Sequence, residues 1–240
     1  GEQLDGLLCA RSRSLRGILN GIDYSVYNPE TDPKIAVHYN EKNAVEKKKE
    51  AKRALQKELG LPVDDSKFMI AIISRLTDQK GLDLVDWITE RIVDEFTQFV
   101  IIGTGESRYE DMFRYYQGRF PDRVSANIFY SDALAHKLYA AADAMLVPSR
   151  FEPCGLTQLI SLRYGTVPIV RETGGLKDTV EPYNEFEKCG TGFTFHNYNA
   201  DDLLYTINYA KNIYFNHRED WNDIIQRGME KDFSWGSSAL

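Results

Sequence analysis

The sequence that decides the fold is Ala144-Met145-Leu146-Val147-Pro148-Ser149-Arg150-Phe151-Glu152-Pro153-Cys154-Gly155-Leu156-Thr157-Gln158. The apolar run 144–147 predicts a buried strand, and helix-compatible sequence begins at Gly155. A strand that leads through a loop into a helix points unpaired backbone N–H groups outward, and such a helix start attracts phosphate. Glu152 lies in this loop, where a carboxylate suits an anionic ligand only if that ligand also carries hydroxyl groups. A phosphate joined to a hydroxyl-rich group describes a nucleotide sugar.

Strand-like and helix-like segments alternate on both sides of this stretch. Apolar segments predict strands at 68–73, 99–102, 128–130, 144–147, 167–170 and 192–195. Helical patterns occur near 41–58, 81–95, 106–118, 132–142, 155–165, 175–181, 200–215 and 218–231. This alternation predicts βαβ units and a parallel sheet, and continuously apolar strands suit a sheet covered by helices on both faces. The predicted class is therefore α/β, with a ligand at the carboxyl ends of the strands.

Composition and charge narrow the class of protein. The 240 residues can bury a full core, and 42% hydrophobic and 27% charged residues are ordinary for a globular protein. The formal charge of −7 argues against nucleic acid as a partner, and no apolar run approaches the roughly 18 to 20 residues of a membrane span. Cys9, Cys154 and Cys189 are odd in number and lack metal-site spacing, which predicts a reducing, cytoplasmic location.

A second loop of phosphate-binding character follows the first strong strand. It reads Ser74-Arg75-Leu76-Thr77-Asp78-Gln79-Lys80-Gly81 and carries two cations five positions apart. Arg75 offers a planar fork and Lys80 a mobile point charge, so the two can converge on a diphosphate. Two solvated surface charges are the alternative. Because another phosphate-type loop is predicted at the same sheet edge, the functional interpretation is favoured.

Other side chains near these loops have both a functional and an ordinary interpretation. Tyr130 is predicted to end a strand, where its ring can stack on a base or pack in the core. The Thr157 hydroxyl can add a donor to a phosphate bound at the helix start. Cys154 lacks a histidine placed to activate it, which disfavours a catalytic thiolate. Glu152 can instead cap or brace its own loop.

Paired glycines follow the next predicted strand. In Thr173-Gly174-Gly175 they allow the backbone to approach a ligand or a neighbouring loop closely. Arg171 and Glu172, directly before them, are interpreted as a surface ion pair.

Taken together, these motifs resemble one enzyme family. The loop 74–81, the stretch 148–158 and Thr173-Gly174-Gly175-Leu176-Lys177-Asp178-Thr179-Val180 are similar to motifs of bacterial glycogen synthase and plant starch synthase. Arg16-Gly17-Ile18-Leu19-Asn20-Gly21-Ile22-Asp23, with 28–32 after it, resembles the segment where that family passes between its two domains. The resemblance covers nearly the whole chain in the family's order, and 151–156 is its most specific motif.

The resemblance implies a retaining glucosyltransferase of the GT-B type, which has two Rossmann-like domains. Such an enzyme transfers glucose from ADP-glucose to the non-reducing end of an α-1,4-glucan. The chain would form one half of it, a Rossmann-like parallel sheet flanked by helices. The expected partners are ADP-glucose or ADP, the glucan acceptor and the other domain. No metal ion or other cofactor is expected, and the location would be a plastid if the source is a plant.

The family's functional positions fall on nine residues. Arg75 and Lys80 would grip the diphosphate and stabilise the departing ADP, and Glu152 would hold hydroxyls of the donor glucose. Preorganised charges of this kind favour the separated charges of the transition state over the ground state. The remaining donor-binding positions are Tyr130 facing adenine, Cys154 lining the sugar pocket, Gly155, Leu156 and Thr157 at the phosphate and ribose, and Asn20 near the sugar at the domain cleft.

The chain departs from the wider pattern in two places. Related transferases often carry a second glutamate eight residues after the first, where this sequence has Ile160. The Lys-x-Gly-Gly loop that opens the family's N-terminal domain does not occur in the 240 residues. We therefore expect 1–50 to be an interdomain segment leading into the C-terminal domain, 51–240 to be the nucleotide-sugar-binding domain, and the N-terminal domain to be absent. Alone, this half should bind its donor weakly and be inactive.

Three alternatives belong to other classes or use other donors. The chain can be a non-catalytic nucleotide-sugar-binding module, or half of a GT-B glycosyltransferase that uses a UDP-sugar. A Rossmann dehydrogenase is disfavoured, because Gly103-Thr104-Gly105 has Arg108 at the third glycine position of the dinucleotide fingerprint. The loop after the first strand carries Arg75 and Lys80 instead of that fingerprint.

Overall fold

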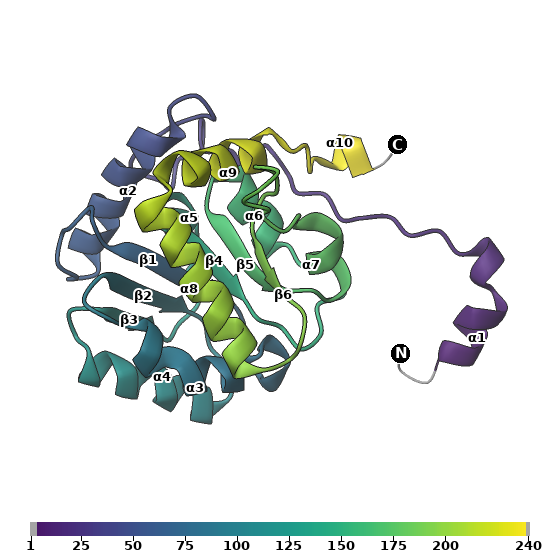
Figure 1. Cartoon of the computed structure of the whole chain (residues 1–240), viewed down its shortest axis with the longest axis horizontal. Coiled ribbons are helices and arrows are strands. Elements are labelled where there is room, and N and C mark those ends of the chain that lie inside the picture. The colour runs from purple at the N-terminus through teal and green to yellow at the C-terminus, as the bar shows by residue number, and fades with distance from the viewer. Residues whose placement is uncertain (1–3, 239–240) are drawn as a thin grey trace.

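The computed structural model describes residues 4–238 and contains a six-stranded parallel sheet in the order β3-β2-β1-β4-β5-β6 (Figure 1). The strands are β1 Phe68–Ile73, β2 Thr97–Ile102, β3 Val124–Asn127, β4 Ala144–Val147, β5 Val167–Arg171 and β6 Phe193–Phe195. All predicted strands except the third overlap an observed one. The predicted α/β class and parallel sheet are confirmed.

The prediction of a strand at 128–130 is wrong, because β3 spans Val124–Asn127. The Asn127 side-chain amide donates to the Ile101 carbonyl at 3.2 Å, where the pairing with β2 ends. The apolar run after it enters a loop, in which Tyr130 is 85% exposed. Its apolar character therefore does not reflect burial in the sheet, and a short edge strand with polar residues escapes a search for apolar runs.

Helices cover both faces of the sheet (Figure 1). Right-handed crossovers from β1 to β3 run in one direction along the sheet and those from β3 to β6 in the other, so α3 and α4 lie on one face and α5, α6 and α7 on the opposite face. The main helices are α2 Ala44–Glu58, α3 Leu82–Ile92, α4 Ser107–Arg119, α5 Asp132–Ala141, α6 Thr157–Arg163, α7 Gly174–Thr179, α8 Ala200–Asn216 and α9 Arg218–Glu230. The short ones are α1 Asp5–Ala10, η1 Ser12–Ser14, η2 Asp78–Lys80 and α10 Trp235–Ser238.

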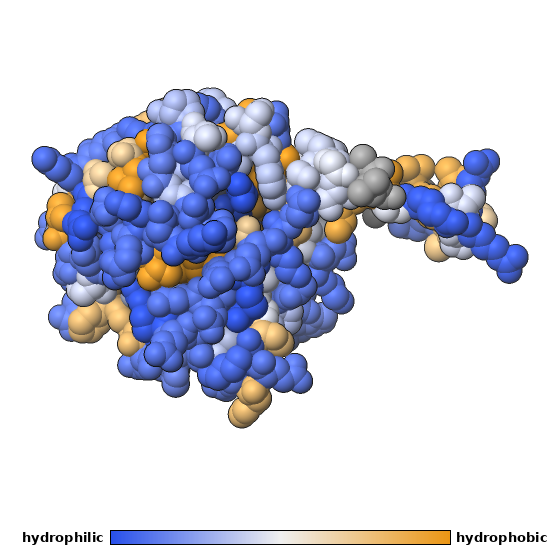
Figure 2. All heavy atoms as spheres, turned by 90° about the horizontal axis from the view of Figure 1, so that it is seen from above, coloured by the Kyte–Doolittle hydropathy of each residue, from blue (hydrophilic) through white to orange (hydrophobic). Residues whose placement is uncertain are grey.

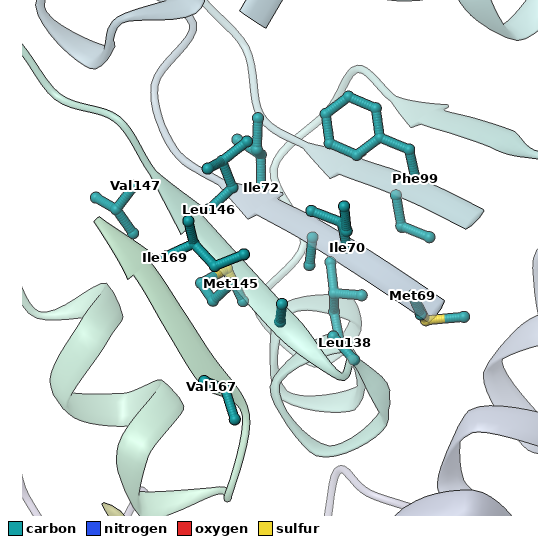
Figure 3. Close-up of a cluster of buried hydrophobic side chains, with 14 of the residues drawn as sticks. Met69, Ile70, Ile72, Phe99, Leu138, Met145, Leu146, Val147, Val167 and Ile169 are labelled. Atoms are coloured by element: carbon teal, nitrogen blue, oxygen red, sulfur yellow. The ribbon is translucent and has the colours of Figure 1, made fainter. Parts of the chain in front are cut away.

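The core lies on β1, β4 and β5, the central strands of the sheet (Figure 3). Met69, Ile70, Met145, Leu146 and Ile169 are each at most 2% exposed. Burying an apolar side chain of this size contributes roughly 1.5–3 kcal/mol. Because both faces are covered, these strands are apolar along their length instead of alternating, as the sequence indicated.

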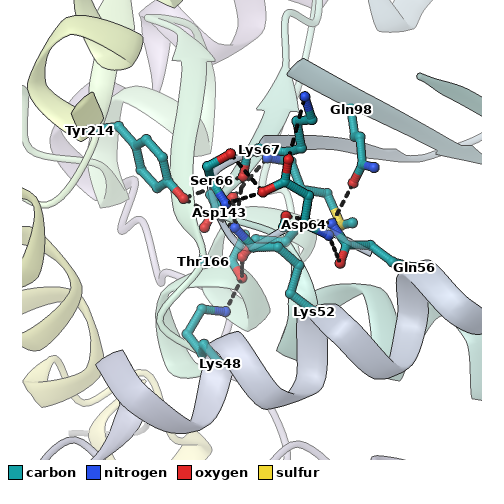
Figure 4. A network of polar contacts seen from close by, with 12 residues as sticks. Lys48, Lys52, Gln56, Asp64, Ser66, Lys67, Gln98, Asp143, Thr166 and Tyr214 are labelled. Carbon is teal, nitrogen blue, oxygen red and sulfur yellow. Dashed lines mark hydrogen bonds and ion pairs between the residues drawn. The ribbon is translucent and has the colours of Figure 1, made fainter. Parts of the chain in front are cut away.

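A buried polar network fastens α2 to the amino ends of the strands (Figure 4). Lys52 Nζ lies 2.6 Å from Asp143 Oδ2, which also accepts from the Met69 amide at 2.7 Å. Lys48 Nζ donates to the Thr166 hydroxyl at 2.8 Å. Burial lowers the pKa of Lys48 to about 7. The network lies opposite the carboxyl edge, so it stabilises the domain without occupying the predicted ligand edge.

Residues 21–40 are anchored to the sheet domain through Asp32. Its Oδ2 atom lies 2.6 Å from His136 Nδ1 on α5 and accepts from the Tyr164 hydroxyl at 2.6 Å. Burial raises the pKa of Asp32, but the hydrogen bonds from Tyr164 and His136 outweigh it and lower the pKa overall. Helix α2 runs through the predicted boundary at residue 50 without a break, and the division into 1–50 and 51–240 stays a prediction.

Residues 4–19 leave the body of the molecule as an arm (Figures 1 and 2). The apolar side chains of Leu7, Leu15, Ile18 and Leu19 on this arm are between 46% and 75% exposed. Exposed apolar surface of this kind is typical of a segment that packs against another protein surface. None of the helices within residues 4–238 has the length and apolarity needed to cross a membrane.

Candidate functional site

The strand order places the switch point of the sheet between β1 and β4, and the region between the loops that follow these two strands is called the crevice below. The two strands are neighbours, but their crossovers leave in opposite directions along the sheet. Ligands of open α/β sheets bind at such a switch point, outside the carboxyl ends of the strands. The loop after β1 carries Arg75 and Lys80, and the loop after β4 carries Glu152. The two loops that the sequence singled out therefore meet at one crevice.

Lys80 and Glu152 form an ion pair across this crevice. Lys80 Nζ lies 2.5 Å from Glu152 Oε2, and the side chains are only 17% and 12% exposed. The Ser149 hydroxyl donates to the same carboxylate oxygen at 3.0 Å. Gly81, directly after Lys80, has φ +71°, and a Cβ there would lie 2.1 Å from the Pro148 carbonyl oxygen. The glycine thus allows the close approach of the two loops that the ion pair needs.

Backbone and side-chain hydrogen bonds hold these loops together. The Arg150 amide donates to the Gln79 carbonyl at 2.8 Å, and Gln79 Nε2 donates to the Phe151 carbonyl at 3.0 Å. Arg171 Nε and Nη2 donate to the carbonyls of Ser149 and Arg150 at 3.1 and 2.8 Å. The loop between β4 and α6, residues 148–156, is therefore held by Gln79 on one side and by Arg171 on the other. It is called the motif loop below.

The interpretation of Arg171 and Glu172 as an ion pair is wrong. Arg171 also donates from Nη1 to the His196 carbonyl at 3.2 Å, so its guanidinium binds three backbone carbonyls. Glu172 Oε1 instead accepts from the Thr194 hydroxyl at 2.8 Å. Local spacing cannot reveal this, because the carbonyls that Arg171 binds lie more than twenty residues away in sequence.

The loop before α6 is shaped by Gly155 and Gln158. Gly155 has φ +72°, and α6 begins at Thr157, two residues after the predicted start. The fully buried Gln158 donates from Nε2 to the carbonyls of Cys154 and Gly155 at 3.1 and 3.0 Å. Within residues 4–238 the amides of Gly155 and Leu156 donate to no acceptor. Sequence reasoning missed Gln158, whose only signal was its place four residues after Cys154.

The glycine pair approaches the motif loop, which is the second of the two predicted alternatives. A Cβ on Gly174 would lie 2.2 Å from the Glu152 carbonyl oxygen, and one on Gly175 would lie 1.9 Å from that of Cys154. The Gly175 amide also donates to the Glu152 carbonyl at 3.1 Å. Neither position has space for a side chain, so both glycines set the shape of the site.

Arg75 differs from Lys80 in having no partner among the residues that the structure describes. Its side chain is exposed and forms no hydrogen bond or ion pair with any described residue. Beside it, the hydroxyl oxygen of Ser74 is buried and also lacks a partner in the described part of the chain. The loop therefore presents one guanidinium that is available to an anion and one ammonium that a carboxylate already neutralises.

Arg150, the cation within the motif loop, already contacts Tyr198 and Asp83. Its guanidinium lies 4.5 Å from the centre of the Tyr198 ring and 3.5 Å from the Asp83 carboxylate. Burial and the hydrogen bond to Asp83 raise the pKa of Tyr198 to about 12. Arg75 and Lys80 thus remain the cations of the crevice.

Two of the predicted donor-binding residues, Tyr130 and Asn20, make no contact with Lys80 or Glu152 in the described structure. Tyr130 is exposed in the loop after β3, and β2 separates β3 from β1. Asn20 is partly buried beside Asp232 and Phe233, near the start of α10. Cys154, by contrast, lies in the motif loop with an exposed side chain. The binding roles of all nine residues stay predictions.

A parallel sheet covered by helices on both faces, with a cationic loop facing a carboxylate loop at its switch point, has the architecture of one half of a GT-B glycosyltransferase. Residues 52–227 match the sequence model of the family described as "Glycosyl transferases group 1". The chain belongs to this family.

Similar proteins narrow this further. The chain is 63% identical over 239 residues to a glycogen synthase of Lachnospira eligens and 64% identical to one of Lachnoclostridium phytofermentans. Each alignment covers 100% of this chain and 50% of the relative. It therefore spans about half the length of the curated relatives it matches. The catalytic domain of starch synthase IV from Arabidopsis thaliana, bound to ADP and acarbose, superposes with a TM-score of 0.91 at 38% identity, over 98% of this chain and 49% of that one.

More distant structures share the fold alone. A sucrose-phosphate synthase from Thermosynechococcus elongatus superposes with a TM-score of 0.67 at 20% identity, over 100% of this chain and 54% of that one. The predicted resemblance to glycogen and starch synthases is confirmed, as is the Rossmann-like domain of a GT-B glycosyltransferase.

Proposed function

We propose that the chain is the C-terminal, nucleotide-sugar-binding half of a retaining glucosyltransferase. The whole enzyme would transfer glucose from ADP-glucose to the non-reducing end of an α-1,4-glucan. Similarity to glycogen synthases and to a starch synthase bound to ADP supports this assignment. The structural observation that carries it is the Lys80–Glu152 pair between the two loops, together with Arg75 on the Lys80 loop, which has no partner among the described residues.

Each predicted residue has a role in this proposal. Arg75 and Lys80 bind the diphosphate, and Glu152 accepts hydrogen bonds from hydroxyls of the donor glucose. The amides before α6 bind phosphate oxygens, since those of Gly155 and Leu156 have no acceptor within residues 4–238. The less direct contacts are those of Thr157 with ribose or phosphate, Cys154 with the sugar pocket, Tyr130 with adenine and Asn20 with the sugar at the domain cleft.

The chemistry explains why a loop with two cations would lie opposite a loop with one carboxylate. When the bond between glucose and the diphosphate breaks, negative charge grows on the phosphate oxygens and positive charge on the sugar. Arg75 and Lys80 stabilise the first, and the carboxylate of Glu152 stabilises the second. Removing one preorganised donor of this kind from an enzyme raises the activation barrier by about 3–4 kcal/mol. No step assigned here uses a metal ion or other cofactor, and that expectation stays a prediction.

A second domain completes the site in this proposal. The N-terminal half of the whole enzyme would supply the acceptor-side contacts and part of the donor-glucose pocket. The exposed apolar side chains of residues 4–19 suit a segment that lies between two domains. The chain alone therefore binds ADP weakly and extends glucan negligibly.

The test is calorimetry of ADP, UDP and ADP-glucose with the chain and two arginine variants. Arg75→Ala should weaken ADP binding at least tenfold, because it removes a charge-assisted contact to phosphate. Arg13→Ala removes the same charge from the exposed arm and should leave the affinity unchanged. Equal ADP affinity in Arg75→Ala and the unchanged chain would take Arg75 out of the site, and tighter binding of UDP than of ADP would refute the donor assignment.

A further inference from the structure

A second pocket lies at the far edge of the sheet, between the edge strand β6 and helix α8. Its volume is about 330 Å³, within the range of small-ligand pockets. The nucleotide crevice lies between β1 and β4, and β5 separates β4 from β6. The lining is rich in aromatic side chains, namely Tyr183, Phe193, Phe195, Tyr205 and Tyr209.

The pocket has a fixed aromatic floor and an exposed aromatic rim. Phe193 is 2% exposed and packs against the Tyr209 ring with a centroid distance of 5.4 Å in an edge-to-face arrangement. Tyr205 is one helical turn before Tyr209, on the same side of α8, and is 74% exposed. Within the described residues its hydroxyl forms no hydrogen bond. The ring of Tyr205 is therefore a flat apolar surface that the fold itself does not use.

Polar groups at the rim favour a neutral ligand that carries hydroxyl groups. Asp202 Oδ2 accepts from Asn197 Nδ2 at 2.8 Å and retains capacity for further donors. His196 Nδ1 lies 3.5 Å from a Glu172 carboxylate oxygen, and the imidazole is largely exposed. Of the described residues, no lysine or arginine lines the pocket. A carboxylate without a balancing cation disfavours phosphates and other anions, so this pocket has a different ligand class from the crevice.

The ligand class that fits is a hexose chain. The C–H face of a pyranose ring packs on an aromatic ring, and its hydroxyls donate to carboxylate oxygens at the rim. Both features are present here within one pocket, in Tyr205 and Asp202. The pocket runs along β6 and reaches His196, directly after the carboxyl end of the strand, and Arg171 binds the backbone both at His196 and at Ser149 in the loop after β4. A polymer held at β6 is therefore kept close to the edge at which transfer takes place.

We infer that the β6–α8 pocket is a glucan-binding site separate from the donor site, which holds the polymeric acceptor on the enzyme. This inference rests on the proposed function, because that function supplies an α-glucan as the polymer. It makes a distinct claim, since the pocket binds sugar without nucleotide. Tyr205 is its main contact, and Asp202 fixes the orientation of the sugar.

The experiment is gel electrophoresis of the chain through increasing concentrations of glycogen, with calorimetry of maltoheptaose in parallel. Tyr205→Ala removes the aromatic surface, and Tyr205→Trp keeps one. Tyr115→Ala is the matched control, because Tyr115 is a 56% exposed tyrosine on α4, beside the opposite edge of the sheet. ADP affinity is measured for all four proteins as an independent check of the crevice.

Tyr205→Ala should weaken glycogen and maltoheptaose binding at least fivefold, while Tyr205→Trp and Tyr115→Ala bind as the unchanged chain does. ADP affinity should be the same in all four proteins. Equal retardation of Tyr205→Ala and the unchanged chain would overturn the inference, as would the absence of any glucan binding by the unchanged chain. Loss of ADP binding in Arg75→Ala tests the proposed function separately, so failure of one is distinguishable from failure of the other.

Discussion

The ion pair between Lys80 and Glu152 predicts opposite effects of its two halves on nucleotide binding. Lys80→Met removes the cation that the proposal places on the diphosphate, and ADP affinity should fall more than tenfold. Glu152→Gln removes a negative charge 2.5 Å from the ammonium and releases Lys80 for the phosphate. ADP affinity should then rise by about two- to fivefold. The preference for ADP-glucose over ADP should fall at the same time, because the sugar loses its carboxylate acceptor.

The stability effects follow from the burial of the pair. Exposed ion pairs contribute about 0–1 kcal/mol, whereas removing one partner of a buried pair costs about 3–5 kcal/mol. Side-chain exposures of 17% and 12% place this pair between the two limits. Lys80→Met leaves the Glu152 carboxylate with the Ser149 hydroxyl as its side-chain donor, which should cost about 2 kcal/mol. Glu152→Gln keeps an acceptor for Lys80 and should cost about 1 kcal/mol.

The assay is urea unfolding and ADP calorimetry of the unchanged chain, both single variants and the double variant. The double variant should lose less stability than the sum of the single variants, by about 1–2 kcal/mol, because no unpaired charge remains. Each 1 kcal/mol corresponds to about 2–4 °C in melting temperature for a domain of this size. Additive losses would show that the pair is not coupled in solution. A fall in ADP affinity in Glu152→Gln as large as in Lys80→Met would refute the assignment of the two charges to different parts of the donor.

Three further predictions concern the frame around the crevice. Gln158→Leu removes the hydrogen bonds to the Cys154 and Gly155 carbonyls. It should weaken ADP binding about tenfold and lower the free energy of unfolding by about 2 kcal/mol. Unchanged ADP affinity would show that Gln158 does not position the site. Gly175→Ala places a Cβ 1.9 Å from the Cys154 carbonyl oxygen and should cost about 3 kcal/mol in urea unfolding, whereas a neutral effect would contradict the contact. Burial lowers the pKa of Lys48 to about 7, so the unfolded chain binds more protons than the folded chain between pH 7 and about 10. The free energy of unfolding should therefore rise with pH in that range, by up to about 1.4 kcal/mol per pH unit. Lys48→Met should flatten this rise in urea unfolding.

The fold could be predicted because its strands carry a simple signal. β1, β4 and β5 are covered on both faces, so a run of apolar residues marks each of them. The edge strand β3 lacks this signal, because Ser125 and Asn127 interrupt it and the apolar run after it lies in an exposed loop. Pairing with β2 determines where β3 lies, and pairing between distant segments cannot be seen in local periodicity.

The site was predictable at the level of loops but not of contacts. Residue types and the strand-to-helix order selected the segments of Arg75, Lys80 and Glu152. They did not indicate that Lys80 and Glu152, 72 residues apart, form an ion pair. Sequence reasoning also missed the roles of Arg171 and Gln158. Each side chain binds backbone carbonyl groups, and because every residue type has a carbonyl group, the sequence does not indicate such partners.

Two side chains without a partner among the described residues lie at the carboxyl edge of the sheet and support a ligand there. At the amino edge, Lys52 and Asp143 pair in a network in which Lys48 also contacts several acceptors. At the carboxyl edge, the guanidinium of Arg75 and the Ser74 hydroxyl have no partner within the described residues. Buried polar groups in folded proteins are nearly always hydrogen-bonded, so the buried Ser74 hydroxyl favours a ligand at the switch point, and the exposed Arg75 guanidinium adds a charge that suits an anion. A diphosphate offers charged acceptor oxygens, and its negative charge suits the Arg75 guanidinium better than a neutral sugar does.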